Sequence, residues 1–197
     1  MRSILLLPLV MAAASCVSSR PIHYYTIEPP SLSAGHSKTD GLVLLVGNIA
    51  TAETLRDGRI RYRSRSNEAG AYEYHRWSER PASMVRESLV RTLQASGKYR
   101  RVLEASSSAI GDYLVRARLH EFGEVDGESI QSRISLRVEL VATETNRNVW
   151  DRLLEREEPV SGKTVADVVQ SLDRNLQHVA DDISAELDKF LSSSEKH

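Results

Sequence analysis

The sequence predicts an α+β fold: a two-layer sandwich in which two helices pack on one face of a mixed, mostly antiparallel sheet. Three observations support this prediction. Segments that alternate apolar and polar residues recur along the chain, a short helical pattern separates the early segments from the later ones, and a long amphipathic helix follows them all. The 197 residues are 41% hydrophobic and 27% charged, a composition that fits one folded domain.

The N-terminal half of this domain is expected to begin with strands. Residues 23–27 (HYYTI) are rich in strand-forming types and end before Pro29-Pro30. Residues 41–47 form a continuous apolar run, which is typical of a strand that is buried on both faces. Residues 59–65 and 71–77 alternate strictly, so we expect an antiparallel hairpin with one aromatic and one charged face.

The later elements are expected to be a helix, three strands and a second helix. The first helix begins near Pro81, since a missing N–H costs little there, and stops at Ser96-Gly97. An antiparallel meander is expected from the strands 113–119, 129–143 and 149–158. From Thr164 to Leu191, apolar residues recur every three or four positions and predict a long amphipathic helix. The domain thus spans residues 23–191, and residues 192–197 are expected to be a flexible tail.

The segment before this domain has the three-part form of an export signal. Residues 1–15 contain an N-terminal arginine, a short apolar run and then small residues, and Cys16, the only cysteine, follows directly. The stretch Ala13–Cys16 resembles a bacterial lipobox, although Ala13 stands where leucine is commonest. This implies a diacylglycerol on the Cys16 thiol, an N-acyl chain such as palmitate, and cleavage before Cys16. Residues 16–22 would then be a lipidated tether.

The residue after the cysteine predicts the destination of the chain. Asp at this position is typical of lipoproteins kept in the inner membrane, and here the position is Val17. The resemblance therefore implies anchoring at the periplasmic face of the outer membrane. The alternatives are an ordinary secreted protein with an unpaired thiol and a buried core cysteine.

The sequence gives no indication of catalysis. The six histidines are scattered, and no nucleophile elbow, P-loop or dinucleotide motif is present. We therefore expect a protein that is not an enzyme, with no metal site and no cofactor besides the lipid on Cys16. The formal net charge of −1 provides no general attraction to nucleic acid, and no nucleic-acid partner is expected.

A row of arginines is the first candidate binding site. Arg59, Arg61, Arg63 and Arg65 alternate along one predicted strand, so they share one face. Guanidinium groups bind phosphate and carboxylate, so this face is a candidate contact for lipid headgroups or an acidic partner. The alternative is the solvated face of a hairpin, with Glu73 paired across to an arginine.

Trp77 is the second candidate, because tryptophan is enriched at partner interfaces. The alternative is a core residue that closes the hairpin onto the following helix, with its indole N–H satisfied nearby.

Several of these stretches together resemble one family. The order is Tyr24–Ile27 after the lipobox, the apolar strand 42–46, the strand Arg59–Arg63, and then Tyr74–Glu79 leading into the helix that begins at Pro81. This order is similar to the ABC-type transport auxiliary lipoprotein family. Two departures are Ile27, where leucine is usual, and the arginine just before the proline.

The resemblance implies a non-catalytic accessory subunit of an ABC/MCE-type intermembrane lipid transport system. The subunit would dock a periplasmic MCE-domain protein at the outer membrane, as a ring of identical copies. An ABC permease and its ATPase would be indirect partners. An outer-membrane assembly lipoprotein that supports a β-barrel or lipopolysaccharide machine is the alternative function. A lipid-tethered periplasmic hydrolase is a third, for which the sequence offers no constellation.

Overall fold

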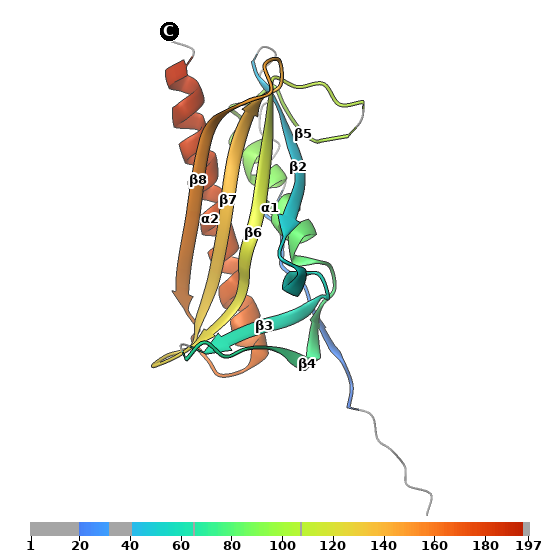
Figure 1. Ribbon diagram of the computed structural model, residues 1–197, viewed down its shortest axis with the longest axis vertical. Helices are drawn as coiled ribbons and strands as arrows, with labels where there is room; N and C mark the ends of the chain where they lie inside the picture. The colour runs from blue at the N-terminus through green and yellow to red at the C-terminus, as the bar shows by residue number, and fades with distance from the viewer. Residues whose placement is uncertain (1–19, 32–40, 65, 107, 195–197) are drawn as a thin grey trace, which may run out of the picture.

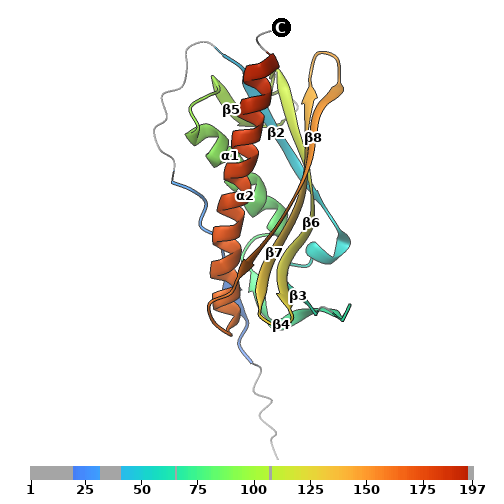
Figure 2. The same ribbon diagram turned by 90° about the vertical axis from the view of Figure 1, so that its left-hand side faces the viewer.

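The computed structural model describes residues 20–31, 41–64, 66–106 and 108–194, and these residues form one eight-stranded sheet and two long helices. The strands are β1 (His23–Tyr25), β2 (Val43–Thr51), β3 (Arg59–Ser64), β4 (Ala69–Trp77), β5 (Arg101–Glu104), β6 (Tyr113–Asp126), β7 (Gln131–Ala142) and β8 (Arg147–Pro159). The helices are α1 (Pro81–Ala95) and α2 (Val165–Ser194), and a 3-10 turn, η1 (Glu53–Leu55), separates β2 from β3. Both helices lie on one face of the sheet (Figure 2), which confirms the predicted α+β, two-layer architecture.

Strand β6 organises the sheet because three strands pair with it. Along one edge it is antiparallel to β7, which is antiparallel to β8, so the predicted meander is confirmed. Along the other edge, β2 pairs with its first half and β3 with its second half, both in parallel. The pairing of β6 with β7 shifts register between Leu119 and Glu121, at the place where β2 gives way to β3. A bulge there bends the strand.

The N-terminal strands contribute more parallel pairing than the sequence predicts. The hairpin of β3 and β4 is antiparallel, as expected, but β1 joins β4 in parallel and β5 joins β2 in parallel. Figure 1 shows the result: β6, β7 and β8 run along the length of the molecule, and β3 and β4 cross its lower end.

The core lies between the sheet and the two helices. One row of α2, from Val168 to Leu191, is buried against the sheet, and the fully buried members include Leu172, Leu176 and Ile183. The same helix is tied to β8 by two ion pairs, Arg152–Glu186 at 3.2 Å and Arg156–Asp182 at 3.4 Å. A contact of 2.5 Å joins Nδ1 of His178 to the carboxylate of Glu158. These three contacts lie on the face of β8 that is directed toward α2. One edge of β8 pairs with β7, and its other edge pairs with no described strand.

One boundary differs from the prediction. Helix α2 continues to Ser194, so residues 192–194 are helical rather than part of a flexible tail. The hydroxyl of Ser193 donates to the carbonyl of Phe190 at 2.7 Å, which is a contact within this last turn. Residues 195–197 lie outside the described residues.

The parallel contact between β3 and β6 depends on a glycine. A Cβ placed on Gly123 would lie 2.5 Å from the backbone oxygen of Arg61, whereas one on Gly47 in β2 would meet Val115 only at 3.4 Å. We expect Gly123→Ala to lower the free energy of unfolding by about 1–3 kcal/mol, because the strands must separate to admit the methyl group. Gly47→Ala is the control, and chemical denaturation measures both. Equal effects of the two substitutions would contradict this account.

Candidate functional site: the charged outer face of the sheet

The face of the sheet that points away from the helices is polar. Along β6, Val115, Ala117 and Leu119 are buried, while Arg116 and Arg118 between them are exposed. Because side chains alternate along a strand, these two arginines point to the outer face. Neither side chain forms an ion pair or a hydrogen bond with any of the described residues, so both guanidinium groups are open to a partner.

A cavity of about 290 Å³ opens on this face. It lies where the parallel neighbour of β6 changes from β2 to β3. Its polar lining includes Arg61, Arg63, His120, Glu121 and Arg133. His120 lies at the register shift of β6, so the cavity occupies the bend between the two parallel partners.

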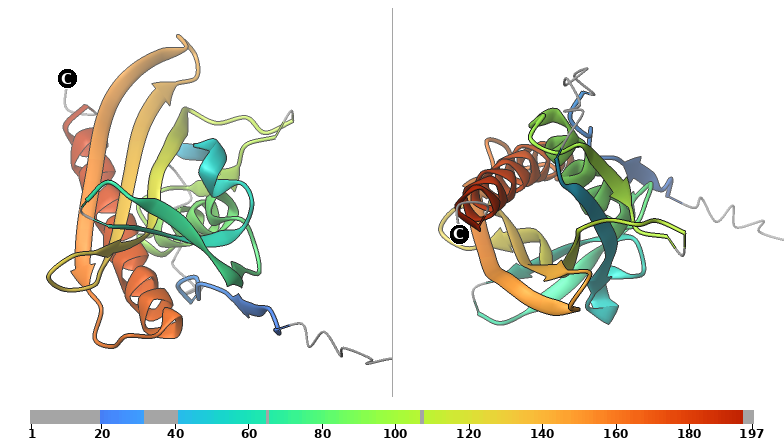
Figure 3. Two further views of the ribbon diagram at one scale, coloured as in Figure 1. Left: turned by 60° about the horizontal axis from the view of Figure 1, so that its bottom comes forward. Right: turned by 90° about the horizontal axis from the view of Figure 1, so that it is seen from above.

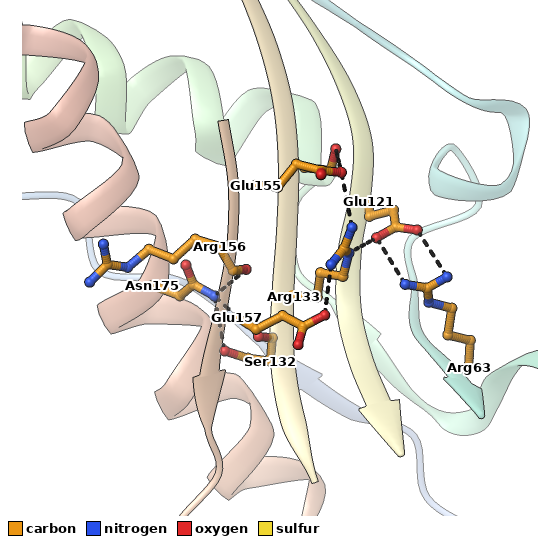
Figure 4. Close-up of polar contacts among 9 residues, drawn as sticks. Arg63, Glu121, Ser132, Arg133, Glu155, Arg156, Glu157 and Asn175 are labelled. Carbon is orange, nitrogen blue, oxygen red and sulfur yellow. Dashed lines mark hydrogen bonds and ion pairs between the residues drawn. The ribbon is translucent and has the colours of Figure 1, made fainter. Parts of the chain in front are cut away.

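The cavity is bordered by a network of ion pairs centred on Arg133 (Figure 4). Arg133 contacts Glu157 at 2.6 Å and Glu155 at 2.9 Å, both on β8, and it also bonds Glu121 on β6. Glu121 also forms an ion pair with Arg63 of β3, with 3.4 Å between the guanidinium nitrogen and the carboxylate oxygen. Four strands are therefore linked across the outer face by groups that are only partly exposed, which limits their screening by solvent.

The opposite face of the same strands is fixed to helix α2. The side-chain amide of Asn175 donates to the backbone oxygens of Ser132 and Arg156, each at 3.2 Å, and Asn175 is fully buried (Figure 4). Ser132 is adjacent to Arg133, so the helix holds β7 and β8 directly beneath the ion-pair network. The network is thus mounted on rigid elements rather than on loops.

An acidic residue at the end of the cavity is unusually buried. Glu124 is 7% exposed and accepts a hydrogen bond of 2.7 Å from the hydroxyl of Tyr72. Burial raises the pKa of Glu124, and the nearby Asp126 adds to this, although the Tyr72 hydrogen bond opposes it. Burial and Glu124 likewise raise the pKa of Tyr72.

The predicted arginine row is present, and its described members are paired with acids. Arg59 and Arg61 contact Asp57 at 2.7 and 2.9 Å, and Arg63 contacts Glu121. Partial burial opposes ionisation of Asp57, but bonds from Arg59 and the charge of Arg61 outweigh it and keep the pKa of Asp57 below its ordinary value. The partners are Asp57 and Glu121, rather than the Glu73 suggested by the sequence.

Of the other predicted site residues, only Trp77 is among the described residues. Trp77 is 4% exposed and stacks at a tilt on Phe122, with ring centroids 5.3 Å apart, so it belongs to the core. Its buried indole nitrogen has no hydrogen-bond partner among the described residues, contrary to the expectation of a satisfied N–H. Arg65 and Cys16 lie outside the described residues, as does the signal segment 1–15.

Sequence reasoning missed the residues that dominate the outer face, namely Arg116, Arg118, Glu121 and Arg133. A signal was available for the first two: charged residues alternate with apolar ones in the predicted strand 113–119, and such a strand has one solvent-facing side. The Glu121–Arg133 contact could not be found in this way, because it depends on the register of two strands and on a bulge.

The arrangement is suited to binding charged groups. No group of three or more His, Cys, Asp or Glu side chains that could hold a metal ion occurs among the residues with defined positions. Within the same residues, no helix is both long and apolar enough to span a bilayer.

The sequence profile of the ABC-type transport auxiliary lipoprotein component family matches residues 25–184. This is most of the chain, and the protein belongs to that family. It is therefore an auxiliary, transport-associated lipoprotein, as the resemblance of the strand and helix motifs implies. No curated protein sequence matches the chain.

Solved structures support the fold. A protein from Xanthomonas campestris has a TM-score of 0.78 at 19% identity, covering 88% of this chain and 99% of its own. An uncharacterised protein has a TM-score of 0.68 at 16% identity, covering 85% and 99%. A hypothetical protein from Chlamydia trachomatis has a TM-score of 0.54 at 13% identity, covering 78% and 99%. At these identities the similarity concerns the fold alone.

The buried Glu124 predicts an unusual pH dependence. Because its pKa is raised, the folded protein disfavours the ionised form, so Glu124 lowers stability as the pH rises above the ordinary glutamate value of 4.5. We expect Glu124→Gln to raise the free energy of unfolding at neutral pH, with a gain that shrinks as the pH falls toward 4.5.

Denaturation across this pH range measures the effect. The companion variant Tyr72→Phe removes the hydroxyl donor and should cost about 1–3 kcal/mol at neutral pH. A gain from Glu124→Gln that is the same at every pH would count against this assignment.

Proposed function

We propose that this protein is a non-catalytic subunit of an ABC/MCE-type intermembrane lipid transport system, anchored through Cys16 at the periplasmic face of the outer membrane. Its role is to dock a periplasmic MCE-domain conduit, and it contacts the ABC permease and ATPase only indirectly. The family match over residues 25–184 is the observation that carries this proposal. Assembly as a homo-oligomer is part of the same proposal.

The geometry of the sheet supports docking rather than turnover. Arg116 and Arg118 present guanidinium groups on the outer face that pair with none of the residues described by the structure, and they lie on the same face as the ion pair of Arg133 and Glu121. Exposed arginines held on a rigid strand favour recognition of carboxylates on a partner protein, because a guanidinium can form two parallel hydrogen bonds. Within the cavity lining, Glu121 is paired with both Arg63 and Arg133.

The anchor and the partner can be tested together. The tagged protein and its Cys16→Ala form are purified from detergent-solubilised envelopes, and the captured proteins are identified by mass spectrometry. We expect the unaltered protein to carry lipid on Cys16 and to capture an MCE-domain protein with its permease. The Cys16→Ala form should be released from the membrane fraction. Capture of a β-barrel protein alone would instead support the outer-membrane assembly function.

The docking face has its own test. Arg118→Glu reverses one exposed charge on β6, and Lys189→Glu reverses an exposed charge on α2, on the other side of the molecule. Loss of an arginine that binds a partner carboxylate costs about 2–5 kcal/mol, so we expect Arg118→Glu to reduce partner capture at least tenfold. Lys189→Glu should leave capture unchanged. Equal capture by both variants would place docking elsewhere.

A further inference from the structure

One end of the molecule carries a surface that the docking proposal does not use. Strands β3 and β4 cross the lower end in Figure 1, and Figure 3 (left), in which this end comes forward, shows them lying across it. β1 extends this part of the sheet through its pairing with β4. The described chain begins three residues before β1, at Arg20.

The two faces of this end differ in their burial. Tyr25 pairs with Trp77, and both pack on the core, so their row faces inward. The neighbouring row is Tyr24, Arg76 and Arg59, which are partners across β1, β4 and β3. Because side chains alternate along strands, this second row faces away from the core.

The outward row belongs to an aromatic and basic surface, which we call the floor surface. It consists of Arg20, Tyr24, Arg59, Tyr74 and Arg76. Tyr24 is 64% exposed, and the guanidinium of Arg20 lies 5.7 Å from the ring centroid of Tyr74. Arg20 and Arg59 are also exposed, whereas Tyr74 and Arg76 are half-buried. Tyrosines and arginines at one end of a domain are typical of a contact with the headgroup region of a bilayer.

Charge on the floor surface favours the same partner. Arg59 shares Asp57 with Arg61. The other two arginines of the floor surface form no ion pair with any residue that the structure describes. Each arginine near an anionic lipid surface contributes about 1 kcal/mol to binding. Ile22, 43% exposed and next to β1, adds apolar area at this end.

The length of the chain before Arg20 limits where this end can lie. This step rests on the lipid anchor at Cys16, which is part of the proposed function. Only three residues lie between Cys16 and Arg20, and the four steps from one Cα atom to the next span at most about 14 Å when extended. An anchored protein must therefore keep Arg20, which lies three residues before β1, within about that distance of the anchor.

We propose that the floor surface lies directly on the phospholipid bilayer that holds the Cys16 anchor. Tyr24 and Tyr74 sit at headgroup depth, and the arginines contact lipid phosphates. β6, β7 and β8 then rise away from the membrane (Figure 1), which leaves their outer face accessible to a periplasmic partner. Orientation would thus be set by the fold as well as by the tether.

Tryptophan fluorescence in vesicles tests this contact. The full-length lipoprotein is matured in cells, purified, and reconstituted in vesicles of phosphatidylethanolamine and phosphatidylglycerol, with or without brominated acyl chains as quenchers. Tyr24→Trp places a probe on the floor surface. Ile110→Trp, at an 89% exposed position in the loop between β5 and β6 at the opposite end, is the matched control. The native Trp77 and Trp150 are buried and provide a constant background.

We expect the Tyr24→Trp emission to shift to shorter wavelength and to be quenched by brominated lipid, whereas Ile110→Trp is not. Mass analysis of the N-terminal peptide reports whether Cys16 is lipidated in the same samples. Lipidated protein whose two probes respond alike would overturn the floor contact and leave the proposed function standing. An unmodified Cys16 would overturn the floor contact and the proposed anchor together.

Discussion

The close parallel contact between β3 and the second half of β6 is the constraint on which the rest of the structure depends. It requires Gly123, because any side chain at that position would meet the backbone of Arg61. This contact turns the β3–β4 hairpin across the end of the molecule and brings Arg63 to Glu121. The cavity on the outer face and the placement of β1 both follow from it.

Helix α2 gives the sheet its rigidity. It buries one apolar row beneath β7 and β8, and its polar contacts to β8 include ion pairs and side-chain hydrogen bonds to the backbone. The amide of Asn175 satisfies backbone oxygens on both strands at once, which fixes them beneath the ion pairs of Arg133. A free edge strand such as β8 is prone to pair with other chains, and the arginines and acids along it oppose such pairing.

The helices and strands could be predicted from the sequence because each of them depends on a pattern of neighbouring residues. The alternation of 59–65 and 71–77 predicted the hairpin, and the apolar steps after Thr164 predicted α2. The parallel neighbours of β1, β5 and β6 were not predictable in this way, because alternation tells which face a side chain occupies and not which strand lies beside it. For the same reason, the partners of Arg61 and Arg63 could be found only from the three-dimensional arrangement. The row of arginines itself was predicted from alternation alone.

The central claim is that the outer face of β6 meets a periplasmic partner. Site-specific photo-crosslinking in living envelopes tests it most directly, with the photoreactive residue placed at position 118 on β6 and, as the control, at position 189 on α2. The account predicts a crosslink to an MCE-domain protein from position 118 and none from position 189. Crosslinks from position 189 alone would contradict the account, because the helix face would then be the docking surface.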